Sequence, residues 1–327
     1  MTLREFIDFS IIRLAPLYPE AEAKAIAFRL LDYYLEIPSY KYISDPDLPI
    51  VPDDRPEQAE TAPARRVERR KAAASADNPQ ALVHRPVSRQ VRKDRAADML
   101  AALDELSTGR PLQYVLGFAD FCGHRFKVGQ GCLIPRPETE EMVSRIIDDL
   151  YTEDPAAEST PDDGPFNILD LCTGSGCIAW SLAAEFPEAM VYGCDLSDAA
   201  LRYACRQRVK LAGARPIFFT ADVLAEPPAG LPKFDVIVAN PPYICDSERA
   251  AMRPNVLDFE PAEALFVPDD DPLRFYRAIA RWTETLLRPD GHIYLEINER
   301  FGPDVAALFP GSCVLQDISG RDRFIVR

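Results

Sequence analysis

The feature that most constrains the fold of this chain is the sequence Asn-Pro-Pro-Tyr at residues 240–243, which directly follows the apolar run 234–239. Such a run predicts a buried strand, and the double proline ends it, because proline has no N–H for a β-ladder and restricts the residue before it. Asn240 is therefore expected at the carboxyl end of a strand, the edge where open α/β sheets bind ligands.

An asparagine at that edge could bind a planar nitrogen group through hydrogen bonds. The side-chain carbonyl of Asn240 and the backbone carbonyl of Pro241 could accept both N–H groups of an amide or an exocyclic amine, while the Tyr243 ring covers its face. The alternative is an ordinary strand-ending turn, since Asn and Pro are common in turns. The sequence upstream decides between these interpretations.

A strand followed by a glycine-containing loop lies upstream. Residues 166–176 read Phe-Asn-Ile-Leu-Asp-Leu-Cys-Thr-Gly-Ser-Gly, and residues 177–185 have a helical pattern. Gly174 and Gly176 allow the backbone to approach a ligand closely and to adopt a positive φ. Many turns between a strand and a helix carry a Gly-x-Gly without binding anything, so this loop alone is weak support.

Two acids at the ends of further apolar runs strengthen the interpretation. The run 190–195 predicts a strand ending in Asp195, about 20 residues after the glycine turn, where nucleotide-binding α/β folds place an acid on a ribose. Asp222 follows the predicted strand 217–220 and could meet an adenine amino group. Each acid has the alternative of a solvated loop residue or a helix N-cap, and for Asp222 alone that alternative is stronger. Their spacing with the glycine loop and Asn240 favours a shared nucleotide site.

These residues together resemble a known group of enzymes. The order Asp170, Gly174, Gly176, Asp195, Asp222 and Asn-Pro-Pro-Tyr is similar to that of the S-adenosylmethionine-dependent amino-group methyltransferases. Four further segments resemble the signature of the peptide chain release factor glutamine N5-methyltransferases: Gly-Arg-Pro-Leu-Gln-Tyr-Val-Leu-Gly (109–117), Phe-Cys-Gly-His-Arg-Phe-Lys-Val (121–128), Leu-Ile-Pro-Arg-Pro-Glu-Thr-Glu-Glu (133–141) and Gly-Arg-Asp-Arg-Phe (320–324). The similarity runs from Gly109 to Arg327, roughly two thirds of the chain.

The resemblance implies an α/β fold of the class I methyltransferase type. This fold is a Rossmann-like seven-stranded sheet in three layers, accompanied by a small N-terminal helical domain and a linking β-hairpin. The expected domains are 1–108 for substrate recognition, 109–136 for the hairpin linker and 137–327 for catalysis with bound S-adenosylmethionine. The implied activity is methyl transfer to the side-chain amide nitrogen of the glutamine in the Gly-Gly-Gln motif of release factors.

The resemblance also implies the site residues. The expected catalytic residues are Asn240, Pro241, Pro242 and Tyr243. The expected cofactor-binding residues are Asp170, Cys172, Thr173, Gly174, Ser175, Gly176, Asp195, Leu196, Asp222, Val223 and Asn240. Arg136, Glu138 and Thr139 are expected to line the pocket, whereas Glu140 and Glu141 are explained by the helix dipole alone.

Composition limits the alternatives. With 52 acidic and 37 basic residues and a formal net charge of -15, the chain as a whole repels nucleic acid, although a local basic site stays possible. The eight cysteines form no Cys-x-x-Cys and there are three histidines, so a metal site has little support. No apolar run approaches about 18 residues and no signal sequence is evident. We therefore expect a cytoplasmic, monomeric protein that binds neither membrane nor stable nucleic acid.

Periodicity organises the rest of the chain. Helical spacing covers residues 1–43, an insertion rich in Pro, Ala and Arg follows at about 44–90, and a helix is expected at 90–107. Residues 65–95 carry ten Lys or Arg against three Asp or Glu. This segment is either a solvated linker or an electrostatic arm. The later expected elements are a hairpin within 113–134, helices at 142–150, 272–287 and 303–308, a polar loop at 152–165, a strand at 292–297, and an antiparallel pair at 314–318 and 323–326.

Three functional alternatives stay open. A nucleic-acid amino methyltransferase would share Asn-Pro-Pro-Tyr, a methyltransferase for another protein's glutamine would keep nearly every motif, and a module that binds cofactor without turnover would keep the fold. One feature of the sequence supports the module without turnover: Cys172 stands where the family has the first glycine of the loop. Its side chain would crowd the cofactor if the backbone there needs a positive φ. Asn298 likewise stands where glycine is common.

Overall fold

The computed structural model describes residues 1–50, 89–153 and 164–327. Most of the insertion expected at 44–90, and most of the polar loop expected at 152–165, lie outside the described residues. The chain divides into two compact units, Met1–Gly109 and Arg110–Arg327. Of the described helices, none is long and apolar enough to cross a membrane.

The N-terminal unit is helical. Its helices are α1 (Leu3–Leu14), α2 (Glu20–Leu35), α3 (Lys41–Ser44) and α4 (Arg89–Leu106). Helix α1 begins at a capping box, in which Thr2 Oγ1 accepts the Glu5 N–H and Glu5 Oε2 accepts the Thr2 N–H. Leu30 and Leu103 are fully buried. The predicted helical spacing therefore marks the faces that pack together.

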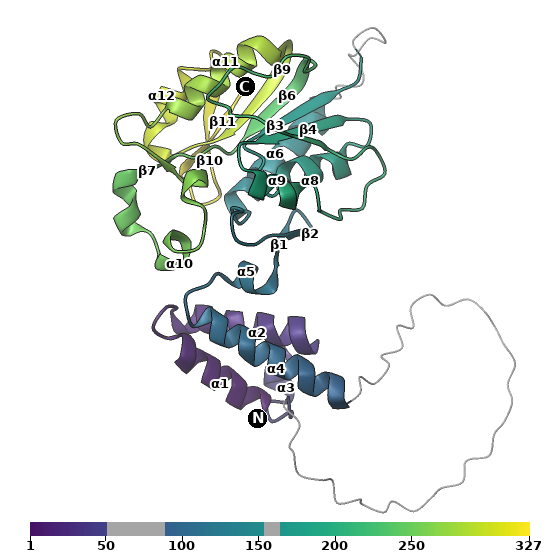
Figure 1. Cartoon of the computed structure of the whole chain (residues 1–327), viewed down its shortest axis with the longest axis vertical. Helices are drawn as coiled ribbons and strands as arrows, with labels where there is room; N and C mark the ends of the chain where they lie inside the picture. Colours follow the sequence, from purple (N-terminus) through teal and green to yellow (C-terminus); the bar gives the residue numbers. More distant parts are fainter. Residues whose placement is uncertain (51–88, 154–163) are drawn as a thin grey trace, which may run out of the picture. The chain divides into compact units, whose positions relative to one another are not determined.

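A seven-stranded sheet forms the centre of the second unit, in the order β10-β11-β9-β6-β3-β4-β5. The strands are β3 (Asn167–Leu171), β4 (Met190–Asp195), β5 (Ile217–Thr220), β6 (Phe234–Ala239), β9 (Leu287–Glu296), β10 (Cys313–Gln316) and β11 (Asp322–Val326). Strands β5, β4, β3, β6 and β9 are parallel (Figure 1). Strand β11 pairs antiparallel with β9 and with β10, so it is the one strand of this sheet that runs in the opposite direction. This is the sheet of a class I methyltransferase, as predicted.

Helices cover both faces of this sheet (Figure 1). Side chains alternate along each buried strand, so Ile168 joins the core beneath α6 (Pro137–Glu153) and α8 (Cys177–Glu185), and Leu169 joins the core beneath α11 (Arg274–Leu286) and α12 (Gly302–Ala306). Helix α9 (Asp198–Ala204) contacts β4 and β5. The result is the three-layer α/β arrangement.

The expected hairpin is present but shorter than predicted. Strands β1 (Phe118–Phe121) and β2 (His124–Lys127) pair antiparallel around Cys122 and Gly123, whose φ angles of 46° and 70° suit a two-residue hairpin turn. The residues before β1 were expected to be extended and instead form the short helix α5 (Leu112–Leu116). Gly117, at φ 79°, ends this helix.

Short elements follow the Asn-Pro-Pro-Tyr segment. They are β7 (Ile244–Cys245), the 3-10 helix η1 (Asp246–Ala251), α10 (Pro254–Leu257), the 3-10 helix η2 (Ala262–Ala264) and β8 (Phe266–Val267). A third 3-10 helix, η3 (Glu299–Phe301), follows β9. Strands β7 and β8 pair in parallel. Strand β9 begins earlier than predicted because Leu287 pairs with Phe234 before a register shift.

Candidate active site

A cavity of about 350 Å³ lies at the carboxyl ends of β3, β4, β5 and β6, within the size range of small-molecule sites. Strand β3 lies between β4 and β6, so the cavity is at the point where the strand order reverses. The residues that line it are Gly131, Leu133, Cys172, Gly174, Asp195, Leu196, Ser197, Ala200, Ala221, Asp222, Val223, Leu224, Asn240, Pro242, Pro261, Glu263, Ala264 and Phe275.

The loop after β3 follows a conformation that glycine favours. Cys172, Gly174 and Gly176 all have positive φ angles, of 58°, 57° and 79°. A β carbon on Gly174 would meet no protein atom within 4 Å, whereas one on Gly176 would lie 3.1 Å from side chains of Ala204, Phe218 and Trp180. Gly174 therefore leaves open space at the cavity wall, and Gly176 permits close packing where α8 begins.

Asp195 connects the glycine loop to the start of α9. Its Oδ2 accepts the Gly174 N–H at 2.8 Å, and its Oδ1 accepts the Ser197 N–H at 2.8 Å. Burial raises the pKa of this carboxyl, although the backbone donors oppose that effect. Each oxygen has a second lone pair, so Asp195 can still accept hydroxyl groups from a ligand in the cavity.

Asp170 lies beneath the same loop and is fully buried. Its Oδ2 accepts the hydroxyl of Thr173 and, at 3.2 Å, the Ala179 N–H, while its Oδ1 has no hydrogen-bond partner among the described residues. Burial raises the pKa of Asp170 from 3.8 to about 7. Thr173 and Ser175 are also buried, so these three residues support the loop.

The remaining predicted cofactor residues lie on the cavity wall. Leu196 is 66% exposed and follows Asp195. Asp222 lines the cavity and also accepts the Leu224 N–H at 2.9 Å. No helix begins at Asp222, so this hydrogen bond closes a turn, and the contact with an adenine stays a prediction.

The Asn-Pro-Pro-Tyr segment is held from several sides. Asn240 and Pro242 line the cavity, and Pro241 is buried. The Asn240 Nδ2 donates to Thr139 Oγ1 at 2.9 Å, and the Tyr243 hydroxyl donates to Glu296 Oε1 at 2.8 Å. Tyr243 packs against the core beneath α11, so its hydroxyl connects this segment to the sheet.

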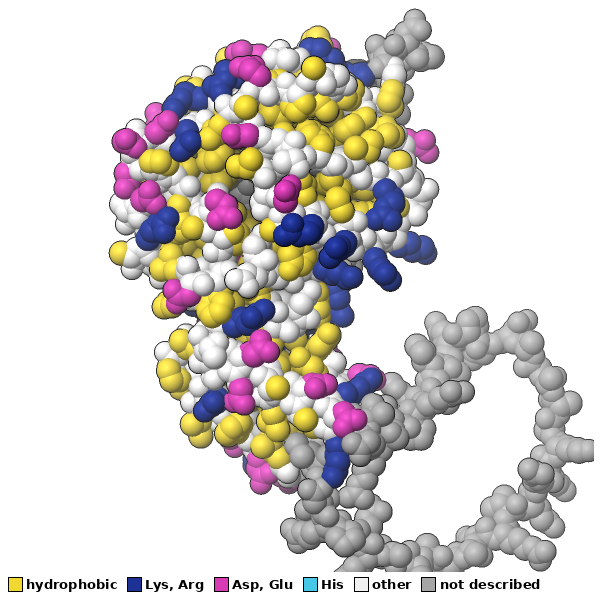
Figure 2. Space-filling model, in the orientation of Figure 1, with side chains coloured by type: hydrophobic (Ala, Val, Ile, Leu, Met, Phe, Trp, Pro, Cys, Tyr) yellow, Lys and Arg dark blue, Asp and Glu magenta, His cyan; other side chains and the backbone are white. Residues whose placement is uncertain are grey.

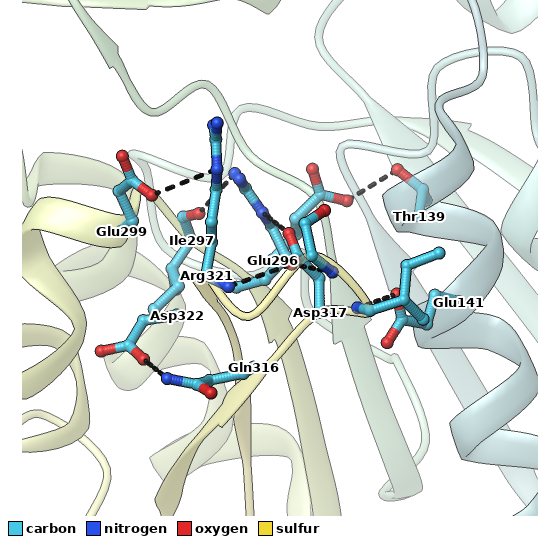
Figure 3. Close-up of polar contacts among 12 residues, drawn as sticks. Thr139, Glu141, Glu296, Ile297, Glu299, Gln316, Asp317, Arg321 and Asp322 are labelled. Atoms are coloured by element: carbon cyan, nitrogen blue, oxygen red, sulfur yellow. Dashed lines mark hydrogen bonds and ion pairs between the residues drawn. The ribbon is translucent and has the colours of Figure 1, made fainter.

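Residues at the end of β9 form hydrogen bonds with Thr139 and with the Asn-Pro-Pro-Tyr segment. Thr139, in the first turn of α6, donates its hydroxyl hydrogen to Glu296 Oε2 at 2.6 Å, and Figure 3 shows the two side chains pointing toward one another. Asn298 donates to the Tyr243 backbone carbonyl at 3.2 Å. Asn298, a departure from the family pattern, therefore has a structural role.

The C-terminal Gly-Arg-Asp-Arg-Phe segment stabilises the same region. Asp317 accepts hydrogen bonds from the N–H groups of Ser319 and Arg321 and from Arg323 Nε, and Figure 3 shows the Arg321 side chain pointing toward Glu299. Arg323 Nη1 also contacts the Ile297 carbonyl at 3.4 Å. The segment thus secures the end of β9.

Arg136 connects two loops near the cavity. Its guanidinium lies 2.6 Å from Glu260 Oε1, and Glu260 Oε2 accepts the Ile134 N–H at 3.0 Å. The Glu260 side chain is 1% exposed, so both oxygens need these partners. Arg136 therefore fixes the chain beside Leu133 on the wall, while Glu138 lies in the first turn of α6.

Sequence reasoning missed several wall residues, among them Leu133, Pro261, Glu263, Ala264 and Phe275. Phe275 belongs to the strongly amphipathic α11, and its pattern indicates a packed helix without showing which residue reaches the cavity. Leu133 begins the segment 133–141, whereas Pro261, Glu263 and Ala264 lie beside or within η2, away from the quoted motifs. Tertiary structure alone brings them to this wall.

Comparisons with known proteins agree with this geometry. The Methyltransferase small domain family matches residues 158–256. The chain is 43% identical over 225 residues to the release factor glutamine methyltransferase of Bacteroides thetaiotaomicron, covering 67% of this chain and 76% of the relative. It is 34% identical to that of Enterococcus faecalis, covering 76% of this chain and 86% of the relative.

A solved structure of magnesium protoporphyrin IX methyltransferase from Synechocystis PCC 6803 with bound SAM is 16% identical, with a TM-score of 0.37, and covers 58% of this chain and 78% of that one. The family assignment depends on the curated relatives, because their identity and coverage are much higher. The chain belongs to the release factor glutamine methyltransferases.

Proposed function

We propose that this enzyme transfers a methyl group from S-adenosylmethionine to the side-chain amide nitrogen of the glutamine in the Gly-Gly-Gln motif of peptide chain release factors. The observation that carries the proposal is the position of Asn240. Asn240 lines the same cavity as Asp195 and Gly174. Its Nδ2 donates to the buried Thr139, which leaves its carbonyl oxygen for an incoming amide.

The cavity fits the proposed cofactor. Gly174 leaves room at the wall for the methionine portion, and Asp195 offers acceptors for ribose hydroxyls. Leu196 and Asp222 provide an apolar surface and an acceptor for an adenine. When bound, S-adenosylmethionine would supply a methyl group from its sulfonium sulfur, and the cofactor would become the neutral thioether.

The chemistry explains why an asparagine and a proline carbonyl suffice. A glutamine amide nitrogen is a poor nucleophile because its lone pair is delocalised into the carbonyl. Fixing it at a near-attack distance of roughly 3 to 3.5 Å contributes several kcal/mol by removing the entropy loss from the reaction step. In our proposal the carbonyls of Asn240 and Pro241 accept its two N–H groups.

The same two acceptors favour the transition state over the ground state. As the nitrogen attacks, positive charge develops on it and its N–H groups become stronger donors, so Asn240 and Pro241 bind it more tightly. The extra proton then passes to water. No histidine is adjacent to the motif in the sequence, and this route needs none.

The experiment that tests the proposal offers the purified enzyme labelled S-adenosylmethionine together with a release factor, DNA or ribosomal RNA in separate reactions. We expect label in the release factor. A release factor with its Gly-Gly-Gln glutamine replaced by alanine serves as the matched control and should stay unlabelled. Label confined to DNA or RNA would overturn the proposal.

One observation favours testing nucleic acid as the second candidate. Between Asp198 and Asp222 the sequence has no acidic residue, and its five basic side chains are all exposed: Arg202, Arg206, Arg208, Lys210 and Arg215. Figure 2 shows Lys and Arg side chains gathered on one side of the catalytic unit. A local basic surface attracts phosphates even where the net charge is negative.

The proposal also includes the organisation of the chain. We assign substrate recognition to the helical unit 1–108, a connecting role to 109–136 and catalysis to 137–327. We further propose a monomer that acts in the cytoplasm, without a membrane or a stable nucleic-acid partner. Size-exclusion chromatography with light scattering would test the oligomeric state.

A further inference from the structure

Glu296 is a buried carboxylate that contacts Tyr243 of the Asn-Pro-Pro-Tyr segment. It ends β9 and is 1% exposed. Its two oxygens accept hydrogen bonds from the hydroxyls of Thr139, at 2.6 Å, and Tyr243, at 2.8 Å. Figure 3 shows the contact with Thr139 bridging the end of β9 and the start of α6.

The direction of these hydrogen bonds has a consequence for Asn240. An ionised carboxylate can accept and cannot donate, so the single hydroxyl hydrogen of Thr139 points to Glu296. The lone pairs of Thr139 Oγ1 are then what Asn240 meets at 2.9 Å, and they must receive an N–H. The amide of Asn240 is thereby held with Nδ2 toward Thr139 and Oδ1 directed away from it.

We propose that Glu296 is a positioning residue for methyl transfer, because through Thr139 it determines which end of the Asn240 amide faces the acceptor glutamine. This inference rests on the proposed function. A flipped Asn240 would present N–H groups to the N–H groups of the substrate, and two donors facing one another cannot bond. Glu296 thus excludes the unproductive orientation without touching the substrate.

Tyr243 gives Glu296 a second connection to the same segment. The Tyr243 hydroxyl occupies Glu296 Oε1, so each oxygen has a donor from a different element. Burial raises the pKa of the Glu296 carboxyl above its usual value, and these two hydroxyls and the nearby Arg323 oppose that rise in part. Raising the pH of the assay favours the ionised form, in which the direction of the hydrogen bonds is fixed.

Two substitutions at Thr139 test the connection. Thr139→Val keeps the shape and removes the hydroxyl, so Asn240 loses its fixed orientation, and kcat should fall about 10- to 100-fold. Thr139→Ser keeps the hydroxyl and should retain most of the activity. The Kd for S-adenosylmethionine, measured by calorimetry, should change by less than about twofold in both, since the glycine loop and Asp195 are untouched.

A substitution at Glu296 tests whether its carboxylate determines the direction of the Thr139 hydroxyl. Glu296→Gln offers one carbonyl oxygen for two hydroxyl donors, so its NH2 group faces Thr139 or Tyr243 and can reverse the Thr139 hydroxyl. We expect a similar loss of kcat with cofactor binding preserved. The matched control is Tyr276→Phe. It removes a hydrogen bond to the Glu296 backbone carbonyl and leaves the contacts of the Glu296 carboxylate unchanged. Its kcat should equal that of the wild type.

The outcomes separate this inference from the function on which it depends. If the wild type does not methylate the release factor, both fail. If the wild type methylates it and Thr139→Val is equally fast, the inference alone fails. A Thr139→Val variant that loses cofactor affinity in proportion to activity, or a Tyr276→Phe variant as slow as Glu296→Gln, would also overturn it. If urea unfolding shows that Glu296→Gln does not fold, the Thr139 pair decides.

Discussion

Asp170 should make the catalytic unit less stable as the pH rises. Burial raises its pKa to about 7, and an aspartate in an unfolded chain titrates near 3.8. Between these values the unfolded state has released its proton while the folded state retains it, so ionisation favours unfolding. The stability present below pH 4 is lost progressively up to about pH 7.

The size of the effect follows from the difference in pKa. One unit corresponds to about 1.4 kcal/mol, so the free energy of unfolding should fall by about 2.5 kcal/mol between pH 5 and pH 8 because of this group. Asp170→Asn removes the ionisation and keeps an oxygen for Thr173 and Ala179. Any unpaired amide hydrogen in the variant adds a cost that does not depend on pH.

Urea unfolding of both proteins at pH 5, 6, 7 and 8 provides the assay. Both tryptophans, Trp180 and Trp282, are buried in the catalytic unit, so their fluorescence reports its unfolding. The variant should gain about 2.5 kcal/mol relative to the wild type across this range. Asp304→Asn, at an exposed position, controls for the loss of one negative charge. A difference between Asp170→Asn and wild type that stays constant with pH would refute the reasoning.

Three further predictions concern the cavity and the insertion. Cys172→Gly should leave the Kd for S-adenosylmethionine unchanged or lower it, because a side chain at φ 58° costs roughly 1 kcal/mol; a clear loss of affinity in calorimetry would mean that the thiol is needed. Asn240→Ala should lower turnover about 100-fold and preserve cofactor binding, whereas Asp195→Ala should first weaken cofactor binding. Equal losses of cofactor affinity in the two variants would contradict these separate roles. Replacing 51–88 by a short Gly-Ser linker should raise the KM for release factor at low salt and matter little at high salt, if the basic segment attracts the substrate; unfolding of the variant would contradict both earlier interpretations of the insertion.

Residues 47–50 belong to the folded helical unit, because the Leu3 N–H donates to the Leu48 carbonyl and Ile50 is 4% exposed. The replacement therefore starts after Ile50. The function of the segment stays a prediction, since residues 51–88 lie outside the described part of the chain.

The sequence predicted the centre of the sheet well for a physical reason. Buried parallel strands are continuous apolar runs, and here the run of β4 ends at Asp195 and that of β6 ends before Asn240 and Pro241. The bounds predicted for 190–195 and for the helix 177–185 match β4 and α8. The edge of the sheet that carries the cavity could be predicted from the same residues, because parallel strands end on one side of a sheet.

The supporting contacts could not be predicted in this way. Glu296 lies 157 residues from Thr139, and Glu260 lies 124 residues from Arg136. An acid at a strand end or in a loop gives no signal of such a partner. The short helix α5 was missed because five residues are too few for a helical period to be seen.

The measurement that tests the central claim most directly is tandem mass spectrometry of the release factor after reaction with the enzyme and S-adenosylmethionine carrying a labelled methyl group. Our account predicts one labelled methyl group, on the side-chain nitrogen of the glutamine in the Gly-Gly-Gln peptide. A methyl group on another residue of the release factor, or none with the wild-type enzyme, would contradict it.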